Sequence, residues 1–115
     1  MNFITIILFL FLNNTPDALI GIWLYKEDTS RIEIYKKDGK ICGKLISSKN
    51  PEFNAGTEIL KDFILIEGKW QGKYFLIKKD QWINAMIYQK KNILHFELNY
   101  GFINKKFHWY KEAKN

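Results

Sequence analysis

From residue 20 onward, apolar and polar side chains alternate in short runs, and each run ends at a cluster of turn-forming residues. Alternation with a period of two places the apolar side chains on one face of an extended strand. No segment keeps a period of 3.6 residues long enough to predict an amphipathic helix. The pattern predicts eight strands, at residues 20–25, 31–36, 41–47, 57–66, 69–78, 81–89, 93–100 and 105–111.

The connections between these runs are short, which favours strands that pair with their neighbours in the chain. Asp38-Gly39 is the strongest turn signal and predicts a tight hairpin. The longest loop is expected at residues 48–56, and a four-residue loop at 101–104. We therefore expect an all-β fold, a single antiparallel up-and-down barrel of about eight strands. A β-sandwich is the competing architecture, but the chain lacks the long crossover connections of a Greek key.

The segment before Asp17 has a different character. Residues 3–12 carry no charge, no glycine and no proline, and nearly all are apolar. This run is too short for a membrane-spanning helix, which takes about 20 residues, but it suits a secretory signal. Residues 1–16 are therefore predicted to be a signal peptide, and 17–115 the barrel of an exported, periplasmic or extracellular protein without a stable membrane span. The alternative is a buried first strand or helix, because the segment lacks a basic residue and a small-x-small cleavage site.

The charge balance argues against nucleic acid as a partner. The net charge is +6, yet Arg31 is the single arginine among 18 basic residues. Nucleic-acid binders use arginine for bidentate contacts to phosphates and base edges. Lysines spread along the whole chain suit solubility, or weak attraction to an anionic membrane, better. With 47% hydrophobic and 17% aromatic residues, the chain is too apolar to be disordered.

No residue pattern specifies a reaction, so we expect no catalytic residues, no cofactor and no enzymatic activity. Phosphate-binding glycine loops, nucleophile elbows and metalloprotease motifs are all missing from the sequence. Cys42, the single cysteine, is expected to be a buried, inert thiol within a strand. The expected register of the last two strands places Glu97 opposite His108, and His95 nearby, on the outer face. A specific metal site needs three or four converging ligands, so we expect a surface Glu97–His108 pair and no metal.

Gly21-Ile22-Trp23, at the start of the first strand, resembles the Gly-x-Trp signature of lipocalins. The resemblance implies that Trp23 plugs one end of the barrel and that a basic residue of the last strand lies across its indole ring. Lys105 is expected to make this contact, because it shares a face with Phe107 and Trp109. A cation–π contact of this kind is worth roughly 0.5–2 kcal/mol. The alternative is an ordinary core tryptophan.

Further motifs follow one another in order along the chain. They are Gly21-Ile22-Trp23, Arg31-Ile32-Glu33-Ile34-Tyr35, Gly39-Lys40-x-Cys42-Gly43-Lys44, Asn50-Pro51, Ile59-Leu60-Lys61-x-Phe63, Trp70 with Gly72, and Gly101 with Trp109. Together they resemble the bacterial domain-of-unknown-function family 2147, small exported proteins with a lipocalin-like barrel. That family has no assigned activity, so the resemblance implies a fold and a location but no reaction.

The barrel pattern, the aromatic content and the Gly-x-Trp motif predict a barrel that binds a small apolar molecule, such as a fatty acid or another lipid. The residues expected to line the barrel interior and its closed end are Trp23, Trp70, Tyr74, Phe96, Lys105 and Trp109. The alternative is a cell-envelope interaction module, in which aromatic side chains fill the barrel and the lysine-rich surface binds a partner. A continuous apolar cavity would favour the first function and a packed core the second. The sequence specifies no oligomeric state.

Overall fold

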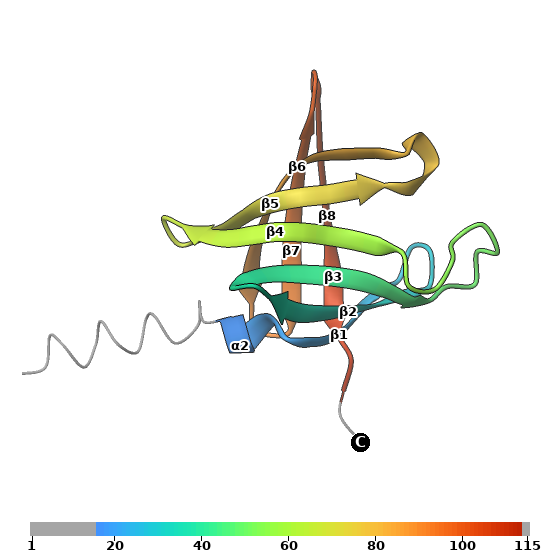
Figure 1. Cartoon of the computed structure of the whole chain (residues 1–115), viewed down its shortest axis with the longest axis horizontal. Coiled ribbons are helices and arrows are strands. Elements are labelled where there is room, and N and C mark those ends of the chain that lie inside the picture. Colours follow the sequence, from blue (N-terminus) through green and yellow to red (C-terminus); the bar gives the residue numbers. More distant parts are fainter. Residues whose placement is uncertain (1–15, 114–115) are drawn as a thin grey trace, which may run out of the picture.

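The computed structural model describes residues 16–113, which form a closed barrel of eight antiparallel strands (Figure 1). The strands are β1 (Gly21–Tyr25), β2 (Ser30–Lys37), β3 (Lys40–Ser47), β4 (Glu58–Ile66), β5 (Lys69–Leu76), β6 (Gln81–Lys90), β7 (Ile93–Tyr100) and β8 (Ile103–Lys111). Each strand pairs with its neighbour in the chain, and β1 also pairs with β8. The predicted up-and-down barrel of eight strands is confirmed. The predicted signal peptide, apart from Pro16, lies outside the described residues.

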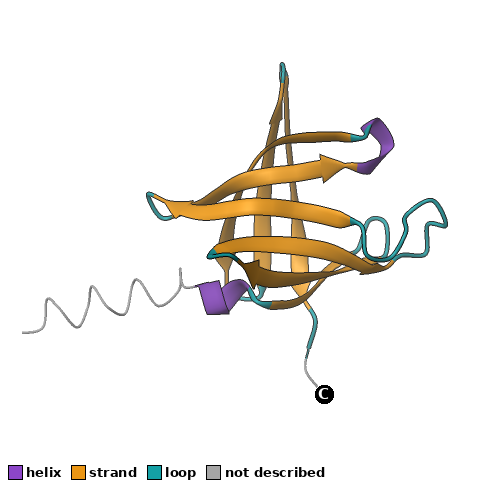
Figure 2. Ribbon diagram, in the orientation of Figure 1, coloured by secondary structure: helices purple, strands orange, loops and turns teal. Residues whose placement is uncertain are grey.

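Helical structure is confined to two short pieces of the described chain, α2 (Pro16–Leu19) before β1 and the 3-10 turn η1 (Ile77–Lys79) after β5 (Figure 2). The strand predicted at residues 69–78 therefore ends two residues early. The Asp80 backbone N–H donates to the Ile77 carbonyl oxygen (3.2 Å), and Asp80 adopts a left-handed conformation with φ 51°. Within residues 16–113, no helix is long and apolar enough to cross a bilayer.

Tight turns join several strand pairs. Lys37 pairs with Lys40, so the turn between β2 and β3 consists of Asp38 and Gly39 alone. Both residues have positive φ, 52° and 78°, as a hairpin turn that follows the right-handed strand twist requires. The hairpin predicted from this dipeptide is confirmed.

The hairpin of β7 and β8 is tighter than predicted. Tyr100 pairs with Ile103, which leaves a two-residue turn in place of the loop expected at 101–104. The pairing is thereby shifted by two residues. A shift of two keeps every side chain on its original face, so the inward positions of Phe107 and Trp109 are unchanged while their partners differ.

This shift changes the neighbours on the outer face. The predicted Glu97–His108 pair is wrong, because Glu97 lies opposite Lys106 and His108 lies opposite His95. The two imidazole rings are 5.7 Å apart, and His95 stacks on Tyr88 at 4.7 Å. Partial burial, followed by the proximity of His108, lowers the pKa of His95. Within residues 16–113, no three His, Cys, Asp or Glu side chains are grouped to hold a metal ion.

The barrel interior is filled along much of its length by inward-facing side chains. Its buried hydrophobic residues include Leu19, Trp23, Ile32, Ile34, Ile41, Leu45, Ile59, Leu60, Phe63, Trp70, Ile83, Ala85, Ile87, Leu94, Phe96, Leu98, Phe107 and Trp109. In β6 the alternation is regular: Ile83 and Ile87 face inward, whereas Trp82 and Tyr88 face outward. Cys42 is buried within β3, as predicted.

Strand β4 departs from regular alternation. Its pairing with β5 shifts between Lys61 and Ile64, and Asp62 has a left-handed φ of 61°. Such a bulge re-aims the side chains that follow it. Phe63 is consequently fully buried, whereas the last three residues of the strand, Ile64 to Ile66, are between 39% and 45% exposed. Only part of this apolar strand therefore contributes to the core.

The barrel closes along a short seam between β1 and β8. Two residue pairs are registered there, Trp23 with Lys111 and Leu24 with Tyr110, against eight pairs between β7 and β8. The Glu112 N–H adds a hydrogen bond to the Ile22 carbonyl oxygen (2.9 Å). Across β1, the Arg31 guanidinium holds the Glu112 carboxylate with two hydrogen bonds, of 3.0 and 2.8 Å. This fork lowers the pKa of Glu112.

One end of the barrel, here called the closed end, is covered by α2 and Trp23. The Trp23 indole N–H donates to the Leu19 carbonyl oxygen at 2.8 Å, and the ring is fully buried. The Lys111 ammonium lies 5.2 Å from the centroid of this ring and donates to the Ile20 carbonyl oxygen at 3.1 Å. A Cβ atom at Gly21 would lie 3.2 Å from Lys111 Cε, so the glycine of the Gly-x-Trp motif makes room for the lysine.

The predicted contact between Lys105 and Trp23 is therefore wrong, and Lys111 takes that position. The register of β1 and β8 places Lys111 beside Trp23. Lys105 is six residues away along β8, or about 20 Å at roughly 3.3 Å per residue. Its ammonium lies 5.8 Å from the Phe107 ring centroid, toward the other end of the barrel.

This assignment can be tested by replacing each lysine with methionine. Lys111→Met removes the cation–π contact and the hydrogen bond to Ile20, so the free energy of unfolding is expected to fall by about 1–2 kcal/mol. Lys105→Met serves as the matched control and is expected to change it by less than about 0.5 kcal/mol. Urea denaturation would measure both. Equal losses, or a larger loss for Lys105→Met, would contradict the assignment.

Candidate functional site

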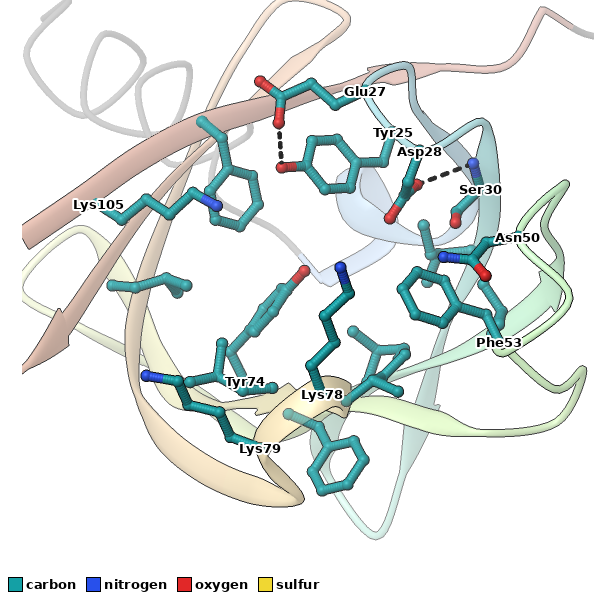
Figure 3. Close-up of a pocket in the computed structure, with 18 residues that line it drawn as sticks. Tyr25, Glu27, Asp28, Ser30, Asn50, Phe53, Tyr74, Lys78, Lys79 and Lys105 are labelled. Carbon is teal, nitrogen blue, oxygen red and sulfur yellow. Dashed lines mark hydrogen bonds between the residues drawn. The ribbon is translucent and has the colours of Figure 1, made fainter.

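The end of the barrel opposite α2, here called the open end, contains a cavity of about 430 Å³ (Figure 3). Side chains from the β1–β2 loop, the β3–β4 loop, η1 and β8 surround it. Its apolar wall is formed by Ile32, Leu45, Phe53, Ile59, Leu98 and Phe107, among others. Ligand pockets typically measure about 300–1,000 Å³, so this cavity is large enough for a small ligand.

Aromatic rings form the base of the cavity and continue into the packed core. Tyr25 stacks on Phe107 with 5.1 Å between ring centroids, and Tyr74 meets Phe107 edge-on at 5.5 Å. Below them, Phe96 lies 4.9 Å from Phe107 and 4.2 Å from Trp109. We call these five residues the aromatic layer. It gives the cavity a rigid apolar base, since such ring pairs add roughly 0.5–1.5 kcal/mol each beyond burial.

Two tyrosine hydroxyls of the aromatic layer differ in their surroundings. The Tyr25 hydroxyl donates to Glu27 Oε2 at 2.6 Å, and burial and then this hydrogen bond raise its pKa. The Tyr74 hydroxyl has no hydrogen-bond partner among residues 16–113, and Figure 3 shows it pointing into the cavity. Burial, with a smaller contribution from Tyr25, raises the pKa of Tyr74. Both hydroxyls therefore stay protonated at neutral pH, and that of Tyr74 is available to a ligand.

Charged side chains divide the rim of the cavity into two sides (Figure 3). Lys78 and Lys79 come from η1 and Lys105 from β8, whereas Glu27 and Asp28 come from the β1–β2 loop. No ion pair within residues 16–113 involves any of these three lysines. The rim therefore presents lysine ammonium groups opposite two carboxylates.

The six residues predicted to line the interior are divided between cavity and core. Tyr74 and Lys105 line the cavity. The other four, Trp23, Trp70, Phe96 and Trp109, are buried and belong to the packed core. The structure thus brings two of the six predicted residues to one site.

Several cavity residues were not among the predicted ones. Tyr25 shares the inward face with Trp23, so the alternation of β1 contained the signal for it. The pattern at residues 69–78 predicts a continuous strand, so it does not identify Lys78 as a residue of the η1 turn at the cavity rim. Phe53 lies in the β3–β4 loop, where its backbone N–H donates to the Asn50 carbonyl oxygen (3.1 Å), and periodicity does not predict how a loop side chain points.

Searches against family models, curated proteins and solved structures returned no match to this chain. The resemblance to family 2147 therefore stays a prediction. The candidate site is defined by its own geometry: an apolar cavity, one unpartnered tyrosine hydroxyl and a rim of unlike charges.

Proposed function

We propose that this protein binds a small molecule with an apolar body, such as a fatty acid or another lipid, in the open end of its barrel. The supporting observation is the cavity of about 430 Å³ with its largely aliphatic and aromatic wall. Burying apolar ligand surface against such a wall contributes roughly 25 cal/mol per Å² before the costs of association. The aromatic layer limits the depth that a ligand can reach, so a single short to medium acyl chain is the size we propose.

The proposed function is binding without catalysis. Cys42 is buried in β3, and both histidines of the chain lie on β7 and β8 away from the cavity wall. The groups that do reach the cavity are tyrosine hydroxyls, lysine ammonium groups and carboxylates of the β1–β2 loop. These suit the orientation of a ligand. We also propose export to the periplasm or the cell exterior, for which the support is the apolar run at residues 3–12.

A cell-envelope interaction module is the second candidate function. The observation in its favour is the tip of the β7–β8 hairpin, where Phe102 is fully exposed and Ile103 is 56% exposed. Large apolar side chains projecting together from a surface often mark an interaction site. This alternative assumes a completely filled barrel. The cavity at the open end fits that assumption less well, so we favour ligand binding.

Titration of the full chain with N-phenyl-1-naphthylamine, an uncharged fluorophore that brightens in apolar sites, would test the proposed function. Saturable binding at one site per chain is expected. Ile77→Trp, which fills the cavity mouth, is expected to weaken binding at least about tenfold. Ile46→Trp is the matched control, because Ile46 is half-buried on β3 but does not line the cavity, and it should bind like the unchanged protein. Absence of saturable binding, together with no co-purifying molecule in native mass spectrometry, would refute the proposal.

A further inference from the structure

We infer that the cavity selects amphiphiles with an anionic head group, a carboxylate in the simplest case, and that Lys78, Lys105 and the Tyr74 hydroxyl hold that group. This inference rests on the proposed binding function, because it specifies which ligands the same cavity prefers. The three groups come from η1, β8 and β5, and all three residues line the cavity, with the Lys78 ammonium and the Tyr74 hydroxyl near its middle (Figure 3).

The two lysines carry positive charge that no carboxylate of residues 16–113 neutralises by an ion pair. The ion pairs formed within residues 16–113 are Arg31–Glu112, Lys40–Asp62 and Lys44–Glu33. In Figure 3 the ammonium groups of Lys78 and Lys105 both point toward the middle of the cavity. The third rim lysine, Lys79, instead lies over the ring of Tyr100 at 4.8 Å, and Tyr100 does not line the cavity. The ring nearest the Lys105 ammonium, that of Phe107 at 5.8 Å, is part of the cavity wall. Lys78 and Lys105 are therefore the cations positioned to meet a ligand.

The carboxylates on the opposite side of the rim are engaged within their own loop. Glu27 Oε2 accepts the Tyr25 hydroxyl at 2.6 Å, and Asp28 Oδ1 accepts the Ser30 backbone N–H at 3.0 Å. A carboxylate that already accepts hydrogen bonds is less available to a cationic ligand. The rim also holds three lysines against two carboxylates, so its net charge is positive and its electrostatic preference is for an anion.

The Tyr74 hydroxyl completes the site as a neutral donor. It belongs to the cavity wall and has no hydrogen-bond partner within the described residues 16–113. Burial keeps it protonated, as its raised pKa indicates. An O–H donor to an anionic oxygen forms one of the stronger hydrogen bonds in proteins. A ligand carboxylate would satisfy this donor, with the acyl chain packed against Leu98, Phe107 and Ile32.

The test is competition between three ligands that share a twelve-carbon chain and differ in head group. Dodecanoate and dodecyltrimethylammonium, each below its critical micelle concentration, and dodecanol, below its solubility limit, would be used to displace N-phenyl-1-naphthylamine from the full chain. Dodecanoate is expected to bind about tenfold more tightly than dodecanol, the sum of two partly exposed charge contacts and one hydrogen bond. Added salt should reduce this advantage, because it screens exposed charges.

Substitutions assign the preference to particular residues. The double variant Lys78→Gln/Lys105→Gln is expected to lose most of the dodecanoate advantage and to bind dodecanol as before. Lys36→Gln/Lys37→Gln is the matched control, since it removes the same net charge from exposed positions at the closed end. Tyr74→Phe is expected to weaken the binding of dodecanoate a further few-fold and that of dodecanol less, because a hydrogen bond to a neutral hydroxyl is weaker than one to a carboxylate.

Each result bears on a different claim. Equal affinity for dodecanoate and dodecanol would overturn the inference and leave the proposed binding function standing. Tighter binding of dodecyltrimethylammonium would also overturn it and would assign recognition to Glu27 and Asp28. The same loss in the control double variant would attribute the preference to net charge and overturn the site. Failure of all three ligands to displace the fluorophore would count against the cavity as an acyl site, hence against the proposed function itself.

Discussion

Replacing Trp23 with alanine is expected to lower the free energy of unfolding by about 3–5 kcal/mol, the usual cost of removing a buried tryptophan. The Trp23 ring is fully buried, so the substitution leaves a void at the closed end. It also removes the indole donor to the Leu19 carbonyl oxygen and the surface over which the Lys111 ammonium lies. These losses affect α2, β1 and β8 together, because Trp23 joins all three.

Trp82→Ala is the matched control for this substitution. Trp82 lies on the outer face of β6, half-buried, beside Phe75 at 5.0 Å and under the Lys61 ammonium at 4.2 Å. Replacing Trp82 with alanine is expected to lower the free energy of unfolding by about 1 kcal/mol. Urea denaturation followed by far-UV circular dichroism would compare the two without relying on tryptophan fluorescence.

If the Trp23→Ala variant does not fold, Trp23→Phe can be compared with Trp82→Ala instead. Phenylalanine retains most of the apolar volume but cannot donate to Leu19, so a loss of about 1–2 kcal/mol is expected. A cost for Trp82→Ala as large as that for Trp23→Ala would contradict the assignment of inner and outer faces in this barrel.

Gly72→Ala is expected to destabilise the barrel by up to about 3 kcal/mol, although it adds only one methyl group. Gly72 faces inward on β5, opposite Ala85 of β6. A Cβ atom there would lie 2.6 Å from Phe63 Cγ and 2.8 Å from the Lys61 carbonyl oxygen. Because one of these neighbours is backbone, a side-chain rotation cannot relieve the whole clash, and β4 must move away from β5.

Gly43→Ala provides the comparison on β3. The nearest atoms to a Cβ there belong to the Leu60 side chain, at 3.0 to 3.2 Å, so a small movement of that side chain suffices. A cost below about 1 kcal/mol is expected. Phe63→Leu combined with Gly72→Ala should cost less than the sum of the two single changes, since the smaller side chain leaves room for the methyl group. If the costs of the two single changes add exactly in the double variant, or if Gly72→Ala alone does not lower the free energy of unfolding, then Phe63 does not pack over Gly72.

The strands and their faces could be predicted because each is encoded locally. In β7 every second residue from Leu94 to Tyr100 is apolar, in β2 the apolar Ile32 and Ile34 alternate with charged residues, and Asp38-Gly39 supplies the backbone conformations of a tight turn. The register of β7 and β8 could not be predicted in the same way. A shift of two residues keeps all side chains on their faces, so the hydrophobic pattern is identical for a two-residue and a four-residue connection.

The position of a residue along the barrel axis could also not be predicted from the sequence. Periodicity assigned Trp23, Phe96 and Trp109 to the interior, but it does not say which interior positions lie at the hollow end and which lie in the packed part. The prediction of Lys105 over Trp23, where the structure has Lys111, was wrong for the same reason: both lysines lie on β8, and periodicity does not give their positions along the barrel axis. Likewise, the bulge at Asp62 has no signature in an apolar strand, so the exposure of Ile64 to Ile66 could not be foreseen.

The short seam between β1 and β8 makes this part of the barrel wall less stable than the rest. Bulges interrupt the pairing of β2 with β3, β3 with β4 and β4 with β5, but the seam is the shortest contact, with two registered pairs, the Glu112–Ile22 backbone hydrogen bond and the Arg31–Glu112 ion pair. Local unfolding takes the least stable route, so fluctuations that part the wall concentrate at this seam. The barrel is therefore expected to open first between β1 and β8. Opening of the seam would break the Arg31–Glu112 ion pair, which involves the single arginine of the chain.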